Sequence, residues 1–293
     1  MKFSIKIKIL FLKCIQIFGY KLVGIKKIVK HNDLDSIINF LLQNYEFAGG
    51  SGKNSRKKII FDIGAHKGQS IERFKKIFNK YLIYSFEPNP YLFIELKKNY
   101  FNDKNVILFN VGLSNNRSTQ NFHIYKHDKI SSFIPADKKS KFYLGRSFSF
   151  GKKKFEKIIK VKCNKLDNFA KKYNINNIDI LKIDTQGFED KVLEGSKELL
   201  KKNIIKIIQL ELTLGFAYKK TLAFFDIEKF LNKYKYKLIC IENSGNIISY
   251  SEYVTDLIYV NYKIYNKIKN IHYKNIYIKN VTKKVTKESS FTY

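Results

Sequence analysis

The stretch "FDIGAHKGQS", residues 61–70, most constrains what this chain can fold into. The apolar run 58–61 at its start reads as a short buried strand, and apolar residues after Gly68 recur at helical spacing. Between them, Gly64 and Gly68 mark a turn in which backbone can come close to a ligand. A strand, a glycine turn and a helix open a βαβ unit of the kind that binds nucleotide-like molecules.

Strand and helix patterns alternate along the chain after this turn. Further strands are expected at 81–87, 105–113, 119–126, 178–184, 204–212, 237–243 and 254–262, and helices at 91–100, 166–174, 188–200 and 224–234. Such alternation predicts an α/β fold with a doubly wound, mostly parallel sheet. The last two strands have no helix between them, so we expect them to form an antiparallel hairpin at one edge.

The chain of 293 residues is long enough for one α/β domain with extensions. We expect a helical extension and loop at 1–57, the main domain at 58–262, and a lysine-rich extension at 263–293. Residues 126–157 form a long insertion, whose aromatic residues could form a lid, stack on a sugar face or pack as a core. These aromatic residues include Phe133, Phe142, Tyr143, Phe148 and Phe150.

Residues 1–45 are expected to be helical, with Lys2, Lys6 and Lys13 on one stripe. We interpret this segment as a helix packed on the domain, with contact to an anionic membrane as the alternative. No apolar run reaches the ~20 residues that cross a bilayer, and no signal-peptide cleavage site follows. Three widely spaced cysteines fit a reducing compartment. The sequence therefore favours a cytoplasmic protein, with membrane association left open.

The net charge of +31 raises the question of a nucleic-acid partner. Only four of the 56 basic residues are arginine, and the lysines are spread along the whole chain. Nucleic-acid readers usually use arginine for bidentate contacts to guanine or phosphate. Compositional drift toward lysine therefore explains the charge better than a nucleic-acid surface does.

The glycine turn fits a cofactor that lacks a pyrophosphate. A dinucleotide fingerprint needs GxGxxG, whereas Ala65 and His66 separate the two glycines here. S-adenosylmethionine carries no phosphate and needs only room for its amino-acid tail, with Asp62 near its ammonium or in the turn's hydrogen bonds. Glu87, 19 residues beyond Gly68, lies at the end of the next strand, where a carboxylate can accept both ribose hydroxyls. The two signals together favour a nucleoside-containing cofactor.

Six motifs occur in the order seen in the FkbM-type family of S-adenosylmethionine-dependent methyltransferases. They are "FDIGAHKGQS", "YSFEPNP", "LFNVGLSNN", "KLDNF", "DILKIDTQGFEDKVLEGS" and "IQLEL". The chain resembles that family over about residues 58–261. The resemblance implies a Rossmann-like class I methyltransferase fold with seven strands and a final antiparallel strand. It also implies O-methylation, mostly of hydroxyls on sugars or natural products, and cofactor contacts from Asp62, Gly64, Ala65, Gly68, Glu87, Asn110 and Val111.

Transfer of a methyl group to an alcohol needs a base for the hydroxyl proton. Asp184 leads, because it ends a buried strand at the edge where open α/β sheets bind ligands. Lys182 lies on the same face of this strand and can keep the Asp184 carboxylate ionised. Asp184 could instead cap the next helix. Glu211 ends the following strand and ranks second. His66 is the weaker candidate, and the histidines show no metal-ligand spacing, so we expect no metal.

Two other functions remain open from the sequence. The chain lacks the motifs of enzymes that methylate exocyclic amino groups or pyrimidine carbon, since 184–187 reads "DTQG" and no proline precedes a cysteine. Methylation of an RNA ribose 2′-hydroxyl is not excluded by either absence. A non-catalytic domain that retains only the fold is the other alternative, and a cofactor titration separates it from both enzymes. We favour a small-molecule, glycan or glycolipid acceptor.

Overall fold

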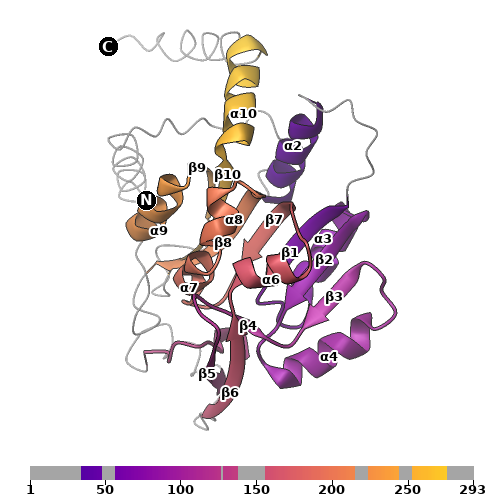
Figure 1. The fold of residues 1–293 in the computed structure, drawn as a ribbon, viewed down its shortest axis with the longest axis vertical. Helices are drawn as coiled ribbons and strands as arrows, with labels where there is room; N and C mark the ends of the chain where they lie inside the picture. Colours follow the sequence, from indigo (N-terminus) through magenta and orange to yellow (C-terminus); the bar gives the residue numbers. More distant parts are fainter. Residues whose placement is uncertain are drawn as a thin grey trace, which may run out of the picture.

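The computed structural model describes residues 34–47, 57–126, 128–137, 156–214, 224–243 and 253–275. Within these residues, seven strands form one sheet in the order β3-β2-β1-β7-β8-β10-β9 (Figure 1). Their bounds are β1 Lys58–Ile63, β2 Tyr81–Phe86, β3 Val106–Phe109, β7 Ile178–Ile183, β8 Ile205–Leu214, β9 Tyr236–Asn243 and β10 Tyr253–Asn261. β10 pairs antiparallel with both β8 and β9, whereas β3, β2, β1, β7 and β8 are parallel. The predicted mostly parallel sheet with an antiparallel hairpin at one edge is confirmed.

The central strands are buried on both faces because helices cover both sides of the sheet. Successive residues of a strand point to opposite faces, so Ile60 and Ile180 belong to one apolar cluster and Phe61 and Leu181 to the other. The first cluster includes residues of α2 Leu34–Phe47, α3 Gln69–Ile77, α4 Pro90–Tyr100 and α10 Tyr262–Asn275. The second includes residues of α6 Leu166–Lys172, α7 Glu189–Glu194, α8 Lys197–Lys201 and α9 Phe224–Lys233.

A smaller sheet, β4-β6-β5, lies beside the carboxyl ends of the main strands in the described residues (Figure 1). It consists of β4 Gly112–Leu113, β5 Ser118–Tyr125 and β6 Glu156–Asn164, and the short helix η2 Asp128–Ile130 follows β5. The single strand expected at 105–113 is therefore wrong. The chain leaves the main sheet at Asn110, whose side-chain amide donates to the carbonyl oxygens of Glu87 and Pro88.

The helix expected at 188–200 is also wrong, because it breaks into α7 and α8 at Gly195. A Cβ on Gly195 would lie 2.1 Å from the carbonyl oxygen of Ser114. Glycine therefore lets the backbone between α7 and α8 pack closely against the backbone at Ser114. The helix expected in 1–45 is seen from Leu34 as α2, while residues 1–33 and the basic stripe lie outside the described residues. So do Phe142, Tyr143, Phe148 and Phe150 of the insertion. No helix in the described part of the chain is long and apolar enough to cross a membrane.

Candidate active site

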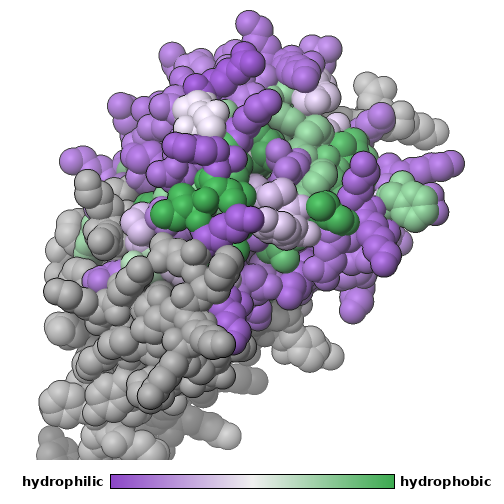
Figure 2. Space-filling view, turned by 90° about the horizontal axis from the view of Figure 1, so that it is seen from below, coloured by the Kyte–Doolittle hydropathy of each residue, from purple (hydrophilic) through white to green (hydrophobic). Residues whose placement is uncertain are grey.

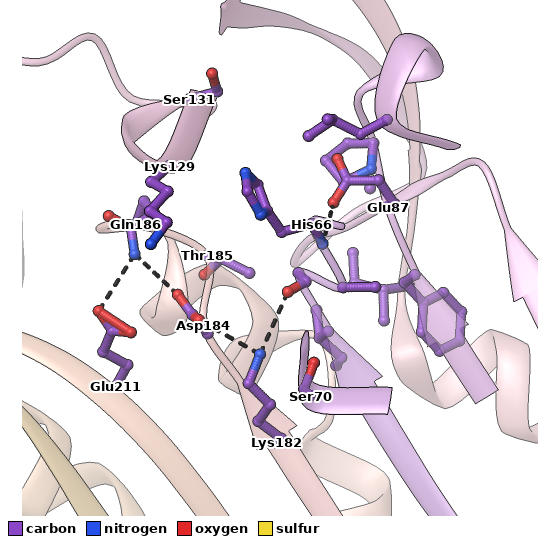
Figure 3. Close-up of a pocket in the computed structure, with 18 of the residues that line it drawn as sticks. His66, Ser70, Glu87, Lys129, Ser131, Lys182, Asp184, Thr185, Gln186 and Glu211 are labelled. Atoms are coloured by element: carbon purple, nitrogen blue, oxygen red, sulfur yellow. Dashed lines mark hydrogen bonds and ion pairs between the residues drawn. The ribbon is translucent and has the colours of Figure 1, made fainter. Parts of the chain in front are cut away.

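A cavity of about 470 Å³ opens at the carboxyl ends of β1, β2, β7 and β8. In Figure 3, Asp184, Gln186 and Glu211 lie together on one side of it, across from Glu87. Its apolar lining comes from Phe86, Leu92, Val111, Leu113, Phe122 and Phe133. Figure 2, a view from below Figure 1, shows a group of apolar residues among hydrophilic ones on the face where β5, β6 and α4 lie. This is the edge at which open α/β sheets bind ligands.

The glycine turn brings backbone to the wall of the cavity. Gly64 has φ of +85°, and a Cβ there would lie 1.8 Å from the carbonyl oxygen of Asp184. The backbone N–H groups of Gly64 and Ala65 both donate to the carbonyl oxygen of Phe86 (3.0 and 3.1 Å). Gly64 and Ala65 both line the cavity. The structure thus explains the glycine and places the turn where the sequence predicted a cofactor.

Asp62 holds the turn in place from within the protein. Its fully buried carboxylate accepts from Ser70 Oγ at 2.8 Å, at the start of α3, and from Ser85 Oγ at 3.3 Å. Its Oδ1 lies 3.2 Å from Lys182 Nζ. Neither Asp62 nor Gly68 lines the cavity; Gly68 has φ of +92° and packs against Tyr100. Direct cofactor contact by these two residues therefore stays a prediction, and their observed role is to shape the turn.

Glu87 is a buried carboxyl group at the cavity wall. It is 5% exposed, and it accepts from the backbone N–H groups of His66 and Asn89 at 2.8 Å each. Burial raises the pKa of Glu87 to about 8 despite these two hydrogen bonds. Asn110 holds the same loop through its bonds to the Glu87 and Pro88 carbonyl groups, but it does not line the cavity. Val111 does line it.

Asp184, directly after β7, and Glu211, within β8, are bridged by Gln186. The expectation that Glu211 ends its strand is wrong, because β8 continues to Leu214. The Gln186 amide donates to Asp184 Oδ1 at 2.9 Å and to Glu211 Oε1 at 3.3 Å (Figure 3). Lys182 Nζ lies 3.4 Å from Asp184 Oδ2 and donates to the Gly64 carbonyl oxygen. The expected pairing of Lys182 with Asp184 is therefore present, and it links the ends of β1 and β7.

The two carboxyl groups differ in protonation. Burial opposes ionisation of Asp184, but the Lys182 ammonium and neighbouring hydrogen bonds outweigh it and hold the pKa below its usual value. Burial, followed by the charges of Asp184 and Asp256, raises the pKa of Glu211 to about 9. At neutral pH, Asp184 carries the negative charge and Glu211 keeps its proton.

Two further groups near Asp184 and the glycine turn take structural roles. Glu189 Oε1 accepts from the backbone N–H groups of Thr185 and Gly187, so it caps the loop that carries Asp184. His66 lines the cavity, but its Nε2 lies 3.1 Å from Asp128 Oδ1. Asp128 also pairs with Lys67 at 2.7 Å, which ties η2 to the glycine turn.

The residues present fit S-adenosylmethionine. Glu87 offers a buried acceptor for ribose hydroxyls at the end of β2, and Leu92 and Val111 give an apolar wall beside it. Gly64 leaves backbone exposed to the cavity at the end of β1. The carboxyl group suits a ribose, the exposed backbone suits an amino-acid tail, and the apolar wall suits a purine.

Sequence reasoning missed several lining residues, among them Arg73, Lys129, Ser131, Gln209 and Asp256. Gln209 gave a usable signal, because it interrupts the buried apolar run "IIQLEL". Phe133, expected in the substrate-binding insertion, does line the cavity. Among the residues that the structure describes, no group of three or more His, Cys, Asp or Glu side chains is arranged to hold a metal ion.

Comparison with known families gives one match over most of the sheet. The domain described as Methyltransferase FkbM domain matches residues 62–238, which is more than half of the chain. The match contains Asp62, Glu87, Asp184 and Glu211.

One curated relative is the 2-O-methyltransferase NoeI of Sinorhizobium fredii, 27% identical over 147 residues. The alignment covers 49% of this chain and 59% of that protein, so the chain spans about three fifths of the relative's length. Solved structures show weaker likeness. The Methanococcus jannaschii fibrillarin pre-rRNA processing protein is 13% identical, covering 75% of this chain and 73% of that chain, with a TM-score of 0.39. The methyltransferase domain of bacterial CtHen1-C is 11% identical, covering 78% and 96%, with a TM-score of 0.40.

Proposed function

This chain belongs to the methyltransferase FkbM family, and from that premise we propose that it transfers a methyl group from S-adenosylmethionine to a hydroxyl of a sugar, glycan or glycolipid. The cofactor, when bound, supplies an electrophilic methyl group on a sulfonium. The protein's part is to align the acceptor oxygen and to receive its proton. We place the cofactor on Gly64, Ala65, Glu87 and Val111.

The observation that carries this proposal is the position of Asp184 at the cavity, with its Oδ2 3.4 Å from Lys182 Nζ and its Oδ1 bridged to Glu211 by the Gln186 amide. Asp184 lines the cavity with its charge maintained by Lys182, so it can accept the proton of an acceptor hydroxyl. Glu211 keeps its own proton and is therefore a hydrogen-bond donor to the acceptor or to Asp184. Two carboxyl groups pushed apart in pKa are the usual arrangement for separate proton-transfer roles. After Asp184 takes the acceptor's proton, the pair holds two protons, one on each carboxyl group, and loses one of them to solvent before the next turnover.

The acceptor class follows from the family and from the cavity wall. The relative named a 2-O-methyltransferase acts on an oxygen, and the family resemblance points to sugars. Phe122 and Phe133, with ring centroids 4.9 Å apart, stand at the cavity and offer aromatic surface to a sugar ring. Ser131 and Gln186 add polar groups that can bind hydroxyls.

An RNA ribose is the second candidate acceptor, because the net charge of +31 attracts any polyanion. A ribose 2′-hydroxyl would need the same base at Asp184. The two acceptors differ in the salt dependence of binding, which is steep for a nucleic acid.

The proposal is tested by incubating the full chain with methyl-radiolabelled S-adenosylmethionine and separate glycan, glycolipid and RNA fractions. We expect label in the glycan or glycolipid fraction, with alkali-stable linkage as an ether. Label only in RNA would favour the second candidate. No transfer to any fraction by protein that binds the cofactor would contradict the sugar assignment.

A further inference from the structure

Arg73 stands in a chain of contacts at the end of the cavity away from Glu87. Its Nη2 donates to Gln209 Oε1 at 2.6 Å, and Gln209 Nε2 donates to Asp256 Oδ1 at 3.0 Å. Its Nε lies 3.3 Å from Asp35 Oδ1, on α2. Arg73, Gln209 and Asp256 all line the cavity. Four elements, α2, α3, β8 and β10, therefore fix the position of one guanidinium.

The guanidinium keeps donor capacity after these contacts. Arginine carries five N–H donors in a rigid fork, and only Nη2 makes a hydrogen bond to a described residue. Nε is buried with no hydrogen bond, at ion-pair distance from Asp35. The guanidinium carbon lies 4.5 Å from the Phe74 ring centroid, which further restricts its orientation. A fixed fork with spare donors is the preferred partner of a carboxylate.

Composition sets Arg73 apart from the other cations. The chain has 56 basic residues, of which four are arginine, so lysine serves at nearly every basic position. Arg73 is the one arginine among the described residues that line the cavity. The other described arginine, Arg117, is exposed in the loop before β5 and does not line it. A flexible ammonium would not hold Gln209 and a planar anion at once.

The sheet order separates Gln209, the partner of Arg73, from the proposed ribose site. From Glu87 at the end of β2, the strands run β2-β1-β7-β8 to Gln209. Three strand spacings of about 4.8 Å make roughly 14 Å. A ligand that starts at Glu87 and crosses the Gly64 turn therefore points toward Gln209 and Arg73, which line the same cavity.

We propose that Arg73, oriented by Asp35 and Gln209, binds a carboxylate at this end of the cavity. The inference rests on the proposed function. Two sources share this chemistry, the amino-acid tail of the cofactor and an acidic substituent of the acceptor. The direction from Glu87 across the Gly64 turn favours the cofactor tail. In either case α2, which precedes the matched family domain, contributes to the binding site through Asp35.

Calorimetry with two product-like nucleosides tests the proposal. S-adenosylhomocysteine carries the amino-acid tail, and 5′-methylthioadenosine lacks it. We expect Arg73→Gln to weaken S-adenosylhomocysteine binding by roughly tenfold to a hundredfold and to leave 5′-methylthioadenosine binding unchanged. Arg73→Lys keeps the charge, and its affinity for S-adenosylhomocysteine should fall between those of the wild type and Arg73→Gln. The ratio of the two affinities is independent of the fraction folded, and Arg117→Gln is the matched control.

The second source is tested with sodium glucuronate, titrated into protein saturated with S-adenosylhomocysteine. If the acceptor supplies the carboxylate, Arg73→Gln loses glucuronate binding while both nucleosides bind as in the wild type. Unchanged binding of all three ligands in both Arg73 variants overturns the proposal. Failure of the wild-type protein to bind either nucleoside contradicts the proposed function instead.

Discussion

Replacement of Asp184 by asparagine separates proton transfer from scaffolding. The amide keeps the size of the side chain but cannot accept the acceptor's proton, so we expect turnover to fall by about 10²–10⁴-fold. That loss corresponds to roughly 3–5 kcal/mol in the barrier. The fold should suffer little, because Lys182 keeps Asp62 at 3.2 Å and the Gly64 carbonyl at 3.3 Å. We expect a stability loss of about 1 kcal/mol.

The assay is a single-turnover rate measured beside melting temperature and cofactor affinity on the same preparation. The matched control is Asp190→Asn, which removes a carboxylate paired with Lys191 outside the cavity. Removing the Asp184 charge also removes one cause of the raised Glu211 pKa. Glu211 should then ionise at a lower pH, and the pH above which the remaining turnover rises should be lower than in the wild type. A normal single-turnover rate in Asp184→Asn would refute the role of Asp184 as base.

Three other substitutions test the site. Above pH 8, where Glu87 is ionised, Glu87→Ala should weaken S-adenosylhomocysteine binding by roughly 1.5–3 kcal/mol in calorimetry, since ribose hydroxyls lose a charge-assisted acceptor; unchanged affinity would remove Glu87 from the site. Gly64→Ala should lower both melting temperature and cofactor affinity, because its Cβ would lie 1.8 Å from a carbonyl oxygen, whereas Gly195→Ala, with a contact of 2.1 Å, should lower melting temperature alone. Glu211→Gln should stabilise the protein by roughly 1–3 kcal/mol at pH 8. The unfolded glutamate ionises near pH 4.5 and the folded one near 9, so wild-type stability falls as pH rises between them; an equal difference at pH 5 and pH 8 would contradict this.

The sequence predicted the main sheet well because its strands are short apolar runs buried on both faces. The run "DILKID" reads as a strand whatever its surroundings, and its position fixes Asp184 at the cavity. The smaller sheet was missed for the opposite reason. β6 alternates exposed lysines, such as Lys160 and Lys162, with buried Val161 and Cys163. That half-buried strand follows the insertion expected at 126–157, and its many lysines masked the strand pattern, so no strand was predicted there.

The sequence predicted the site residues that a local pattern identifies, such as a glycine turn or a strand end. It missed those whose side chains meet from distant parts of the chain. Gly64 and Glu87 could be read from local pattern. Arg73 meets Gln209 over a separation of 136 residues, and no local signal predicts that contact. For Asp62, the sequence placed the residue correctly at the end of its strand. It could not show that the side chain is buried within the protein and does not line the cavity.

The most direct test of the proposed function is calorimetric titration of the full chain with S-adenosylhomocysteine, the demethylated product of the cofactor. We expect one binding site per chain, competition by S-adenosylmethionine, and binding that weakens below pH 8 as Glu87 takes up a proton. Sign and pH window follow from the raised pKa, since the protonated carboxyl group is the weaker acceptor for ribose hydroxyls. Folded protein that binds neither S-adenosylhomocysteine nor S-adenosylmethionine would contradict the assignment of this cavity as a methyl-transfer site.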